Sequence, residues 1–426
     1  MSGQMDLFGA AEGTATPTDA TDVVAVTRAP RRPASATLEP PGADANESEG
    51  SGPTDPLFAH DPPVDALNFA GSTDPLLAPE RPSDRLAPRD DADPPAIDPA
   101  PTARASEAPR RSPPTTEPDA AIDPRSLLVI DGTAMIFRAY YGLGSRRAPN
   151  GAEVGAVTGV CHQLLGVLRR QSATHVVVVF DAAQETFRNR IDPRYKANRG
   201  DPPDELVPQF DLIKEITTAI GLHTLAKLDY EADDLMATFA ALARAAGIPA
   251  RLVAVDKDLC QSVVDDAPTC DLYDPKSEEL TDGAGVIRRL GVRPEQVVDL
   301  MALTGDSTDN IQGVRGVGPK AAVALLEAFG DLDGVYRSLD RVEYLGIRGA
   351  KALARKLEEG RDDAFLARRL VRLDDAVDLG IAAAGLTDAT TWRGPRGDAD
   401  PLMAEYGLRG PLAGFRRLFD TRPLPA

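Results

Sequence analysis

The sequence LLVID at residues 127–131 is a short apolar run that stops at an acid, and VVVVFD at residues 176–181 repeats this pattern. A third run, ARLVAVD at residues 250–256, also ends on an aspartate. Such runs are typical of buried parallel strands. Between and around them, apolar residues at helical spacing predict helices over 155–170, 204–220 and 232–246. The alternation predicts an α/β fold with a doubly wound, mostly parallel sheet.

Nine carboxylates occur in five short motifs, three of which are the ends of these apolar runs. They are Asp131, Asp181, Glu231, Asp233, Asp234, Asp256, Asp258, Asp306 and Asp309. Because ligands of open α/β sheets bind beyond the carboxyl ends of the strands, we expect these acids to converge. Two carboxylates about 4 Å apart repel by roughly 4 kcal/mol at an effective dielectric near 20, so the cluster needs cations. Oxygen ligands select Mg²⁺ or Mn²⁺, and a pair of such ions is the usual apparatus for cutting phosphodiesters.

Each acidic motif also has a simpler interpretation. A strand-end aspartate can cap the next helix, which applies to Asp131 and Asp181. Acids in a first helical turn complement the helix dipole, which applies to Glu231, Asp233 and Asp234. Asp256 and Asp258 can lie in a solvated loop. The recurrence of acids at every strand end favours the metal site over these separate explanations.

Two further segments have the chemistry of nucleic-acid binding. Residues 186–206 (TFRNRIDPRYKANRGDPPDEL) are basic and contain Tyr195, so they can attract phosphates and stack a base. Residues 313–320 (GVRGVGPK) have glycines spaced for a tight hairpin whose backbone approaches a phosphate without reading sequence. The alternatives are a solvated charged loop and an ordinary glycine-rich turn.

The first 125 residues differ in composition from the rest of the chain. They hold 22 of the 37 prolines, with 22 acids against 10 arginines and no lysine, a net charge of −12 out of −19. Such a segment cannot bury enough apolar surface to offset chain entropy and is expected to be disordered. No signal peptide and no apolar run near the ~20 residues of a membrane span is visible. Three cysteines without a CxxC pair indicate a reducing compartment, hence a cytoplasmic protein.

Near the N-terminus, Gln4-Met5-Asp6-Leu7-Phe8 resembles the pentapeptide that binds the bacterial sliding clamp. Leu7 and Phe8 would fill an apolar pocket, and Gln4 would make polar contacts. The alternative is an arbitrary apolar pair in a tail.

Residues 126–380 resemble the 5′→3′ exonuclease domain of bacterial DNA polymerase I, within the flap endonuclease family. The shared motifs are LLVIDGTAMIFRAYYGL, VVFDAAQETFRNR, DPRYKANR, YEADDLMAT, AVDKDL and LTGDSTDNIQGVRGVGPKAA. The resemblance implies a PIN-like nuclease domain at 126–282 with a basic arch at 182–205. It also implies a helical DNA-binding subdomain with a helix-three-turn-helix element at 283–385, followed by an extension at 386–426. The stretch MAEYGLRGPLAGFRRLFD resembles the link to the rest of polymerase I, so a stand-alone nuclease is expected.

The resemblance also implies roles for single residues. The first metal ion would be bound by Asp131, Asp181, Glu231 and Asp233, and the second by Asp256, Asp258, Asp309 and a shared Asp233. Asp234 and Asp306 would lie around these ligands, and Thr133 is expected to affect none of them. DNA would be contacted by Tyr140, Arg188, Tyr195, Lys196, Arg199, Gly313, Gly316, Gly318 and Lys320. A K⁺ ion is expected at the hairpin 313–320.

The function expected from these features is a monomeric, nucleoid-associated 5′→3′ exonuclease or flap endonuclease. It would act on DNA flaps, nicks and RNA primers with two Mg²⁺ or Mn²⁺ ions, and Lys196 would neutralise charge on the phosphate. One rival is a non-catalytic DNA-binding scaffold recruited to the sliding clamp. Another is a ribonuclease on a similar fold, which the arch and the hairpin disfavour.

Overall fold

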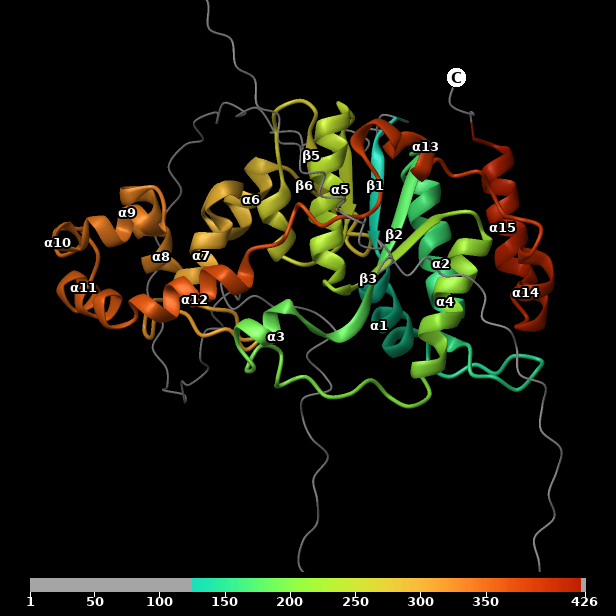
Figure 1. Cartoon of the computed structure of the whole chain (residues 1–426), viewed down its shortest axis with the longest axis horizontal. Helices are drawn as coiled ribbons and strands as arrows, with labels where there is room; N and C mark the ends of the chain where they lie inside the picture. Colours follow the sequence, from blue (N-terminus) through green and yellow to red (C-terminus); the bar gives the residue numbers. More distant parts are fainter. Residues whose placement is uncertain (1–124, 423–426) are drawn as a thin grey trace, which may run out of the picture. The chain divides into compact units, whose positions relative to one another are not determined.

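A six-stranded sheet lies at the centre of the computed structural model, which describes residues 125–422 (Figure 1). The strand order is β3-β2-β1-β4-β5-β6; the first five are parallel, and β6 is antiparallel to β5. The strands are β1 Leu127–Asp131, β2 His175–Thr186, β3 His223–Asp229, β4 Ala250–Val253, β5 Cys270–Tyr273 and β6 Leu280–Thr281. The mostly parallel sheet predicted from the sequence is confirmed.

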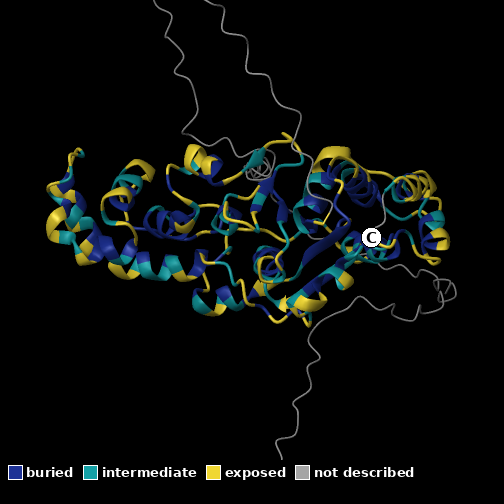
Figure 2. Cartoon of the chain, turned by 90° about the horizontal axis from the view of Figure 1, so that it is seen from above, coloured by how far each residue is buried: buried dark blue, intermediate teal, exposed yellow. Residues whose placement is uncertain are grey.

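Both faces of the sheet are covered, as the uninterrupted apolar run of β1 predicts. Leu127 and Val129 belong to one core, Leu128 and Ile130 to another, and all four side chains are fully buried (Figure 2). Successive side chains of a strand point to opposite faces, so a strand with apolar residues at every position needs a layer on each side. The first core includes α5 (Ala232–Ala246), and the second includes α1, α2 and α4. These three helices are α1 Gly132–Leu143, α2 Gly155–Arg170 and α4 Val207–Ala219.

The chain after β6 is mostly helical, as predicted. Its buried side chains are continuous with the core on the α5 face, and α12 packs along α7. The elements are α6 Gly283–Leu290, η3 Pro294–Gln296, α7 Val297–Thr304, α8 Pro319–Phe329, α9 Leu332–Arg337, α10 Leu339–Val342, α11 Ala350–Glu359 and α12 Arg361–Val371. Two short elements precede them in the chain, α3 (Phe187–Ile191) after β2 and η2 (Asp258–Ser262) after β4.

The C-terminal segment contributes to both cores, since Leu386 belongs to the core on the α5 face and Leu402 and Phe415 belong to the opposite one. It contains η4 Ala383–Gly385, α13 Leu386–Thr390, α14 Ala399–Glu405 and α15 Arg409–Asp420. Helix α15 packs on α2 with Phe415 fully buried, and the ring centroids of Trp392 and Phe419 lie 5.5 Å apart. The guanidinium of Arg422 lies 4.7 Å from the Trp392 ring centroid and donates to the Gln171 carbonyl. The extension expected at 386–426 thus contains α13, α14 and α15.

The end of β1 lies tightly against β2 at a glycine. A Cβ added to Gly132 would lie 2.3 Å from Cε1 of Phe180, which is closer than any real contact. Gly132 directly follows Asp131, and Phe180 directly precedes Asp181. The missing side chain thus lets the acid that ends β1 lie close to the acid-bearing part of β2.

The structure adds three strands that the sequence pattern did not indicate: β3, β5 and β6. They have seven, four and two residues, and they lie on either side of the predicted central strands. Within residues 125–422, no helix has the length and apolar character needed to cross a membrane.

Candidate metal centre

Asp131 is the last residue of β1, and Asp181 lies within the neighbouring strand β2, two residues beyond Val179, the partner of Asp131. Asp131 ends β1 and caps α1, since one carboxylate oxygen accepts a 2.8 Å hydrogen bond from Ala134 N. Asp181 accepts a 2.7 Å bond from Ala232 N, which ties β2 to the start of α5. Burial raises the pKa of Asp131 to about 7, and the charges of Asp181 and Asp256 add to the effect. Burial also raises the pKa of Asp181. Helix capping alone does not explain why a second buried acid, Asp181, lies where its charge raises the pKa of Asp131.

The three acids at the start of α5 separate into two environments. Asp234 turns inward and accepts hydrogen bonds from Arg188 and from the backbone N of Glu231. Asp233 points to the strand ends, where burial and the charges of Asp256 and Asp131 raise its pKa well above the ordinary value. Adjacent residues of one motif thus have different roles, one paired in the core and one unneutralised at the site.

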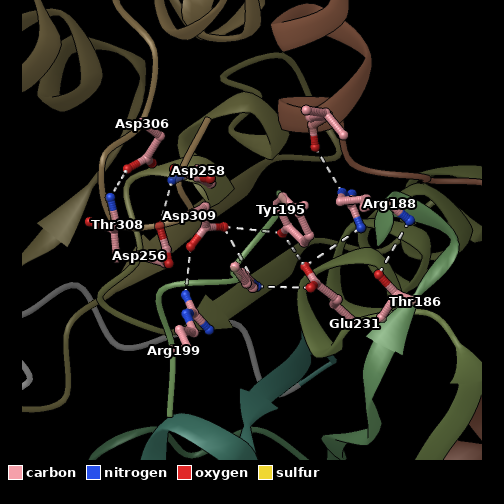
Figure 3. Close-up of polar contacts among 12 residues, drawn as sticks. Thr186, Arg188, Tyr195, Arg199, Glu231, Asp256, Asp258, Asp306, Thr308 and Asp309 are labelled. Carbon is pink, nitrogen blue, oxygen red and sulfur yellow. Dashed lines mark hydrogen bonds and ion pairs between the residues drawn. The ribbon is translucent and has the colours of Figure 1, made fainter. Parts of the chain in front are cut away.

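A second group of acids lies beside the first, on η2 and on the loop after α7. The backbone N of Asp258 donates to Asp256 at 2.9 Å, and Asp306 accepts from Thr308 N at 2.9 Å (Figure 3). Burial together with the charges of Asp256 and Asp306 raises the pKa of Asp258 well above its usual range. One carboxylate oxygen of Asp258, Oδ1, is buried and has no hydrogen-bond partner. A buried oxygen without a donor is a position that a cation satisfies.

Basic side chains enter the cluster from the loop after α3. Lys196 Nζ lies 2.8 Å from Glu231 Oε1 and 3.5 Å from Asp309 Oδ2. Arg199 contacts Asp309 at 2.5 Å, and the Tyr195 hydroxyl donates to Glu231 at 2.9 Å and to Asp309 at 3.1 Å (Figure 3). The backbone reaches this position with Lys196 in the left-handed region, at φ 54°. The loop therefore supplies counter-charges from within the chain.

The residues fit divalent cations by the chemistry of their donors. All the clustered ligands are carboxylates, which suit hard cations such as Mg²⁺ and Mn²⁺. In residues 125–422 no three acidic, His or Cys side chains already have the arrangement of an assembled metal site. Lys196 and Arg199 hold Glu231 and Asp309 instead, while burial leaves Asp131, Asp233 and Asp258 with raised pKa values and Asp258 with an unsatisfied oxygen.

Two residues expected to contact DNA lie inside the protein instead. Arg188 is 1% exposed, makes two 2.7 Å hydrogen bonds to Asp234, and also donates to the carbonyls of Leu370 and Arg372. Tyr195 is 3% exposed and is occupied by Glu231 and Asp309, so it is not positioned to stack a base. Contrary to the expectation that they contact DNA, Arg188 and Tyr195 are buried and hold acids of the cluster in position.

The other expected DNA contacts lie at or near the surface. Tyr140 of α1 is half-buried and donates to Glu205 at 2.5 Å. In the hairpin, Gly316 has φ +79° and Gly318 caps α8, while Lys320 in the first turn of α8 is exposed. A Cβ on Gly313 would lie 2.2 Å from Gly305 N, so this glycine serves backbone packing. A concave pocket lined by residues 304–317 opens at the hairpin.

Two family models match the chain in succession. The model for the 5′-3′ exonuclease N-terminal resolvase-like domain matches residues 126–291, and that for the 5′-3′ exonuclease C-terminal SAM fold matches residues 292–392. The chain belongs to the 5′-3′ exonuclease family. Together the matches cover the sheet, all nine acids and the hairpin.

Known relatives of this 5′-3′ exonuclease family chain include DNA polymerase I of Rhizobium leguminosarum, 38% identical over 306 residues, and that of Pseudomonas aeruginosa, 40% identical over 256 residues. The matches cover 70% and 60% of this chain but only 28% of either relative. The chain thus spans a little over a quarter of the length of these relatives.

Solved structures similar to this chain include T5 5′-exonuclease with bound zinc, at 20% identity and a TM-score of 0.48. That match covers 69% of this chain and 100% of the other. The catalytic core of Rad2 in complex with DNA substrate is similar at 15% identity and a TM-score of 0.46, covering 69% of this chain and 91% of the other.

Two residues of this exonuclease-family site were missed from the sequence. The Thr133 hydroxyl accepts a 2.9 Å hydrogen bond from Asp181 N, so the expectation that Thr133 affects no ligand is wrong. Lys257 Nζ lies 3.0 Å from Asp306 Oδ2. The position of Lys257 between two acids of the motif is a signal that could have indicated this role, whereas nothing local indicates Thr133.

Proposed function

We propose that this chain is a structure-specific 5′→3′ nuclease that hydrolyses phosphodiesters of 5′ flaps, nicks and RNA primers. The observation that carries the proposal is the cluster of buried carboxylates with raised pKa values around the end of β1, in a chain of the 5′-3′ exonuclease family. A non-catalytic DNA scaffold has no use for such mutual repulsion. The proposed division of labour is catalysis in residues 126–282, duplex binding in 283–385 and recruitment through 1–125.

The proposed cofactors are two Mg²⁺ or Mn²⁺ ions. Asp131, Asp181, Glu231 and Asp233 would hold one, and Asp256, Asp258 and Asp309 the other, with Asp233 shared and Asp306 beside them. Bound there, divalent ions supply Lewis-acid activation of water and of the scissile phosphate. We further propose a K⁺ ion at the hairpin 313–320, supported by the concave pocket at its backbone.

Side chains of the protein itself would orient the metal-binding acids and neutralise the charge of a bound phosphate. Lys196 and Arg199 lie against Glu231 and Asp309, so a phosphate at the site would meet their ammonium and guanidinium groups. Tyr195 holds the carboxylates of Glu231 and Asp309 relative to each other. Asp234 and Arg188 fix the start of α5 and thereby Asp233.

Cleavage of a labelled flap duplex tests the nuclease proposal. With Mg²⁺ we expect cutting at the flap junction that EDTA abolishes, and with Asp233→Ala we expect binding in a gel shift without cutting. Binding without cutting by the unaltered protein under both Mg²⁺ and Mn²⁺ would establish the scaffold alternative.

We also propose recruitment to a bacterial sliding clamp through Gln4, Met5, Asp6, Leu7 and Phe8, which lie outside the described residues. The expected setting is a monomer in the cytoplasm, associated with the nucleoid. Deleting residues 1–10 should remove clamp binding and leave cleavage of naked flaps unchanged. Clamp affinity that survives the deletion would contradict the motif assignment.

A further inference from the structure

The hairpin sequence has a partner later in the chain. Gly-Val-Arg-Gly at 313–316 is matched by Gly-Ile-Arg-Gly at 346–349. The last glycine of each is left-handed, Gly316 at φ +79° and Gly349 at φ +83°. The helix that follows each turn carries a lysine as its second residue, in α8 after the first turn and in α11 after the second. The chain thus presents two turns of similar sequence and backbone conformation.

The second turn is open to the outside. A Cβ added to Gly346 or Gly349 would meet no atom within 4 Å, so nothing in the described chain covers this backbone. Arg348 and Lys351 are exposed, and Tyr344 beside them is 79% exposed. These side chains and their backbone are accessible to a second molecule.

The second turn is also strongly basic in an acidic protein. Residues 341–356 contain five basic residues and one acid, a net charge of +4, whereas the whole chain carries −19. One of the five, Arg355, pairs with Glu359 at 3.6 Å, and both are exposed. Within residues 125–422, neither Arg348 nor Lys351 forms an ion pair. A concentration of positive charge like this suits a polyanion.

The two turns lie side by side because α11 connects them. Lys356 of α11 donates to the Gly316 carbonyl at 3.1 Å, and a Cβ on Gly360 would lie 2.9 Å from Val314. Gly349 and Lys356 are seven positions apart in the sequence, which is about 10 Å along α11. That span corresponds to about three base pairs at 3.4 Å each. Figure 1 shows α10 and α11 at the end of the helical region farthest from the sheet.

We propose that the second basic turn, residues 341–356, is an additional binding surface for the phosphate backbone of duplex DNA, with Arg348 and Lys351 as its phosphate contacts. It rests on the proposed function, because it extends the duplex footprint that begins at the hairpin 313–320. The surface binds the part of the duplex more distant from the carboxylate cluster. It contacts backbone and therefore carries no sequence preference.

Binding of the full chain to flap DNA in EDTA tests this surface apart from catalysis. The variant is Arg348→Ala with Lys351→Ala, and the matched control is Arg409→Ala with Arg417→Ala, two exposed arginines of α15. Fluorescence anisotropy gives the Kd at several salt concentrations, with the duplex arm lengthened one base pair at a time. The double variant Arg348→Lys with Lys351→Arg should have the same Kd and salt dependence as the unaltered protein, because both positive charges are kept.

We expect the Ala variant to bind a long duplex about tenfold more weakly and to lower the slope of log K against log salt by about two, since each lost phosphate contact removes about 0.9. Its affinity should stop rising with duplex length about three base pairs earlier than that of the control. An unchanged salt slope and length dependence would overturn the proposal. Flap cleavage with Mg²⁺ in the same proteins tests the nuclease function separately. If no protein cuts but the Ala variant still has the smaller salt slope, only the nuclease proposal is contradicted and the DNA-binding surface stands.

Discussion

Arg188 and Asp234 form a bidentate ion pair inside the protein, with both hydrogen bonds at 2.7 Å. Arg188 is 1% exposed and Asp234 is 0% exposed. The preceding residue, Asp233, has no such partner within residues 125–422 and instead adds to the repulsion among the clustered acids. Two neighbouring aspartates therefore contribute to folding with opposite sign.

Substitution of Asp234 and of Asp233 should change the stability of the metal-free protein in opposite directions. Asp234→Ala or Asp234→Asn leaves a buried guanidinium without its counter-charge, which typically costs about 3–5 kcal/mol. Asp233→Asn removes a repulsive charge and should raise the melting temperature of the metal-free protein while abolishing cleavage. Thermal unfolding in EDTA checks both, and equal destabilisation by the two changes would contradict this assignment.

Lys196→Ala should lower cleavage by about 10² while leaving flap binding in EDTA within a few-fold, because the ammonium is expected to act on charge developed in the reaction. Single-turnover cleavage with saturating enzyme is the measurement. Lys276→Ala, an exposed lysine on the loop after β5, is the control and should cut normally. A Lys196→Ala protein that cuts at the normal rate would exclude this role.

Stability should depend on pH through the raised carboxyl pKa values. The folded-state pKa of Asp131, about 7 against an ordinary 3.8, means that its protonated form favours folding. This contribution is complete below about pH 4 and is lost as pH rises through 7. Asp181, Asp233 and Asp258 shift in the same direction.

The rise in melting temperature on adding Mg²⁺ should therefore grow between pH 5.5 and pH 8. Burial lowers the pKa of His175 and His223, but their effect is present with and without metal and cancels in this difference. Asp131→Asn should flatten the dependence. A Mg²⁺ effect that is constant over this range would refute the linkage.

The segment beyond the family match should be part of the fold. Phe415 is fully buried against α2, so Phe415→Ala is expected to cost about 3–5 kcal/mol. Arg417→Ala, on an exposed position of the same helix, should change stability by less than about 0.5 kcal/mol. Denaturant unfolding compares the two, and equal midpoints would show that α15 contributes little.

The central strands and the helices α2, α4 and α5 could be predicted from the sequence because their signals are local. Helix α5 has acids in its first turn and a left-handed Gly247 after its last residue, and its predicted bounds agree with the structure. Strands β5 and β6 have four and two residues and are specified by their pairing with neighbours. The edge strand β3 has seven residues, but polar side chains interrupt its apolar ones, so no apolar run reveals it.

The acids of the site could also be located, because parallel strand ends necessarily meet at one edge. The burial of Arg188 could not be predicted, because its partner Asp234 lies 46 residues away in the sequence and the surrounding segment contains several basic residues. A charged loop sequence does not tell which of its arginines turns inward. The same applies to Thr133, whose hydroxyl meets the backbone of a strand 48 residues later.

The contact between Gly132 and Phe180 has a consequence for recognising inactive members of this family. A side chain at position 132 would meet the ring of Phe180, the residue before Asp181, so the ring or the strand would have to shift. A shift of the strand would change the distance between Asp131 and Asp181 although every acid remained in the sequence. The presence of all nine carboxylates is therefore an incomplete guide to whether the cluster is assembled, and the glycine after the first of them belongs in the comparison.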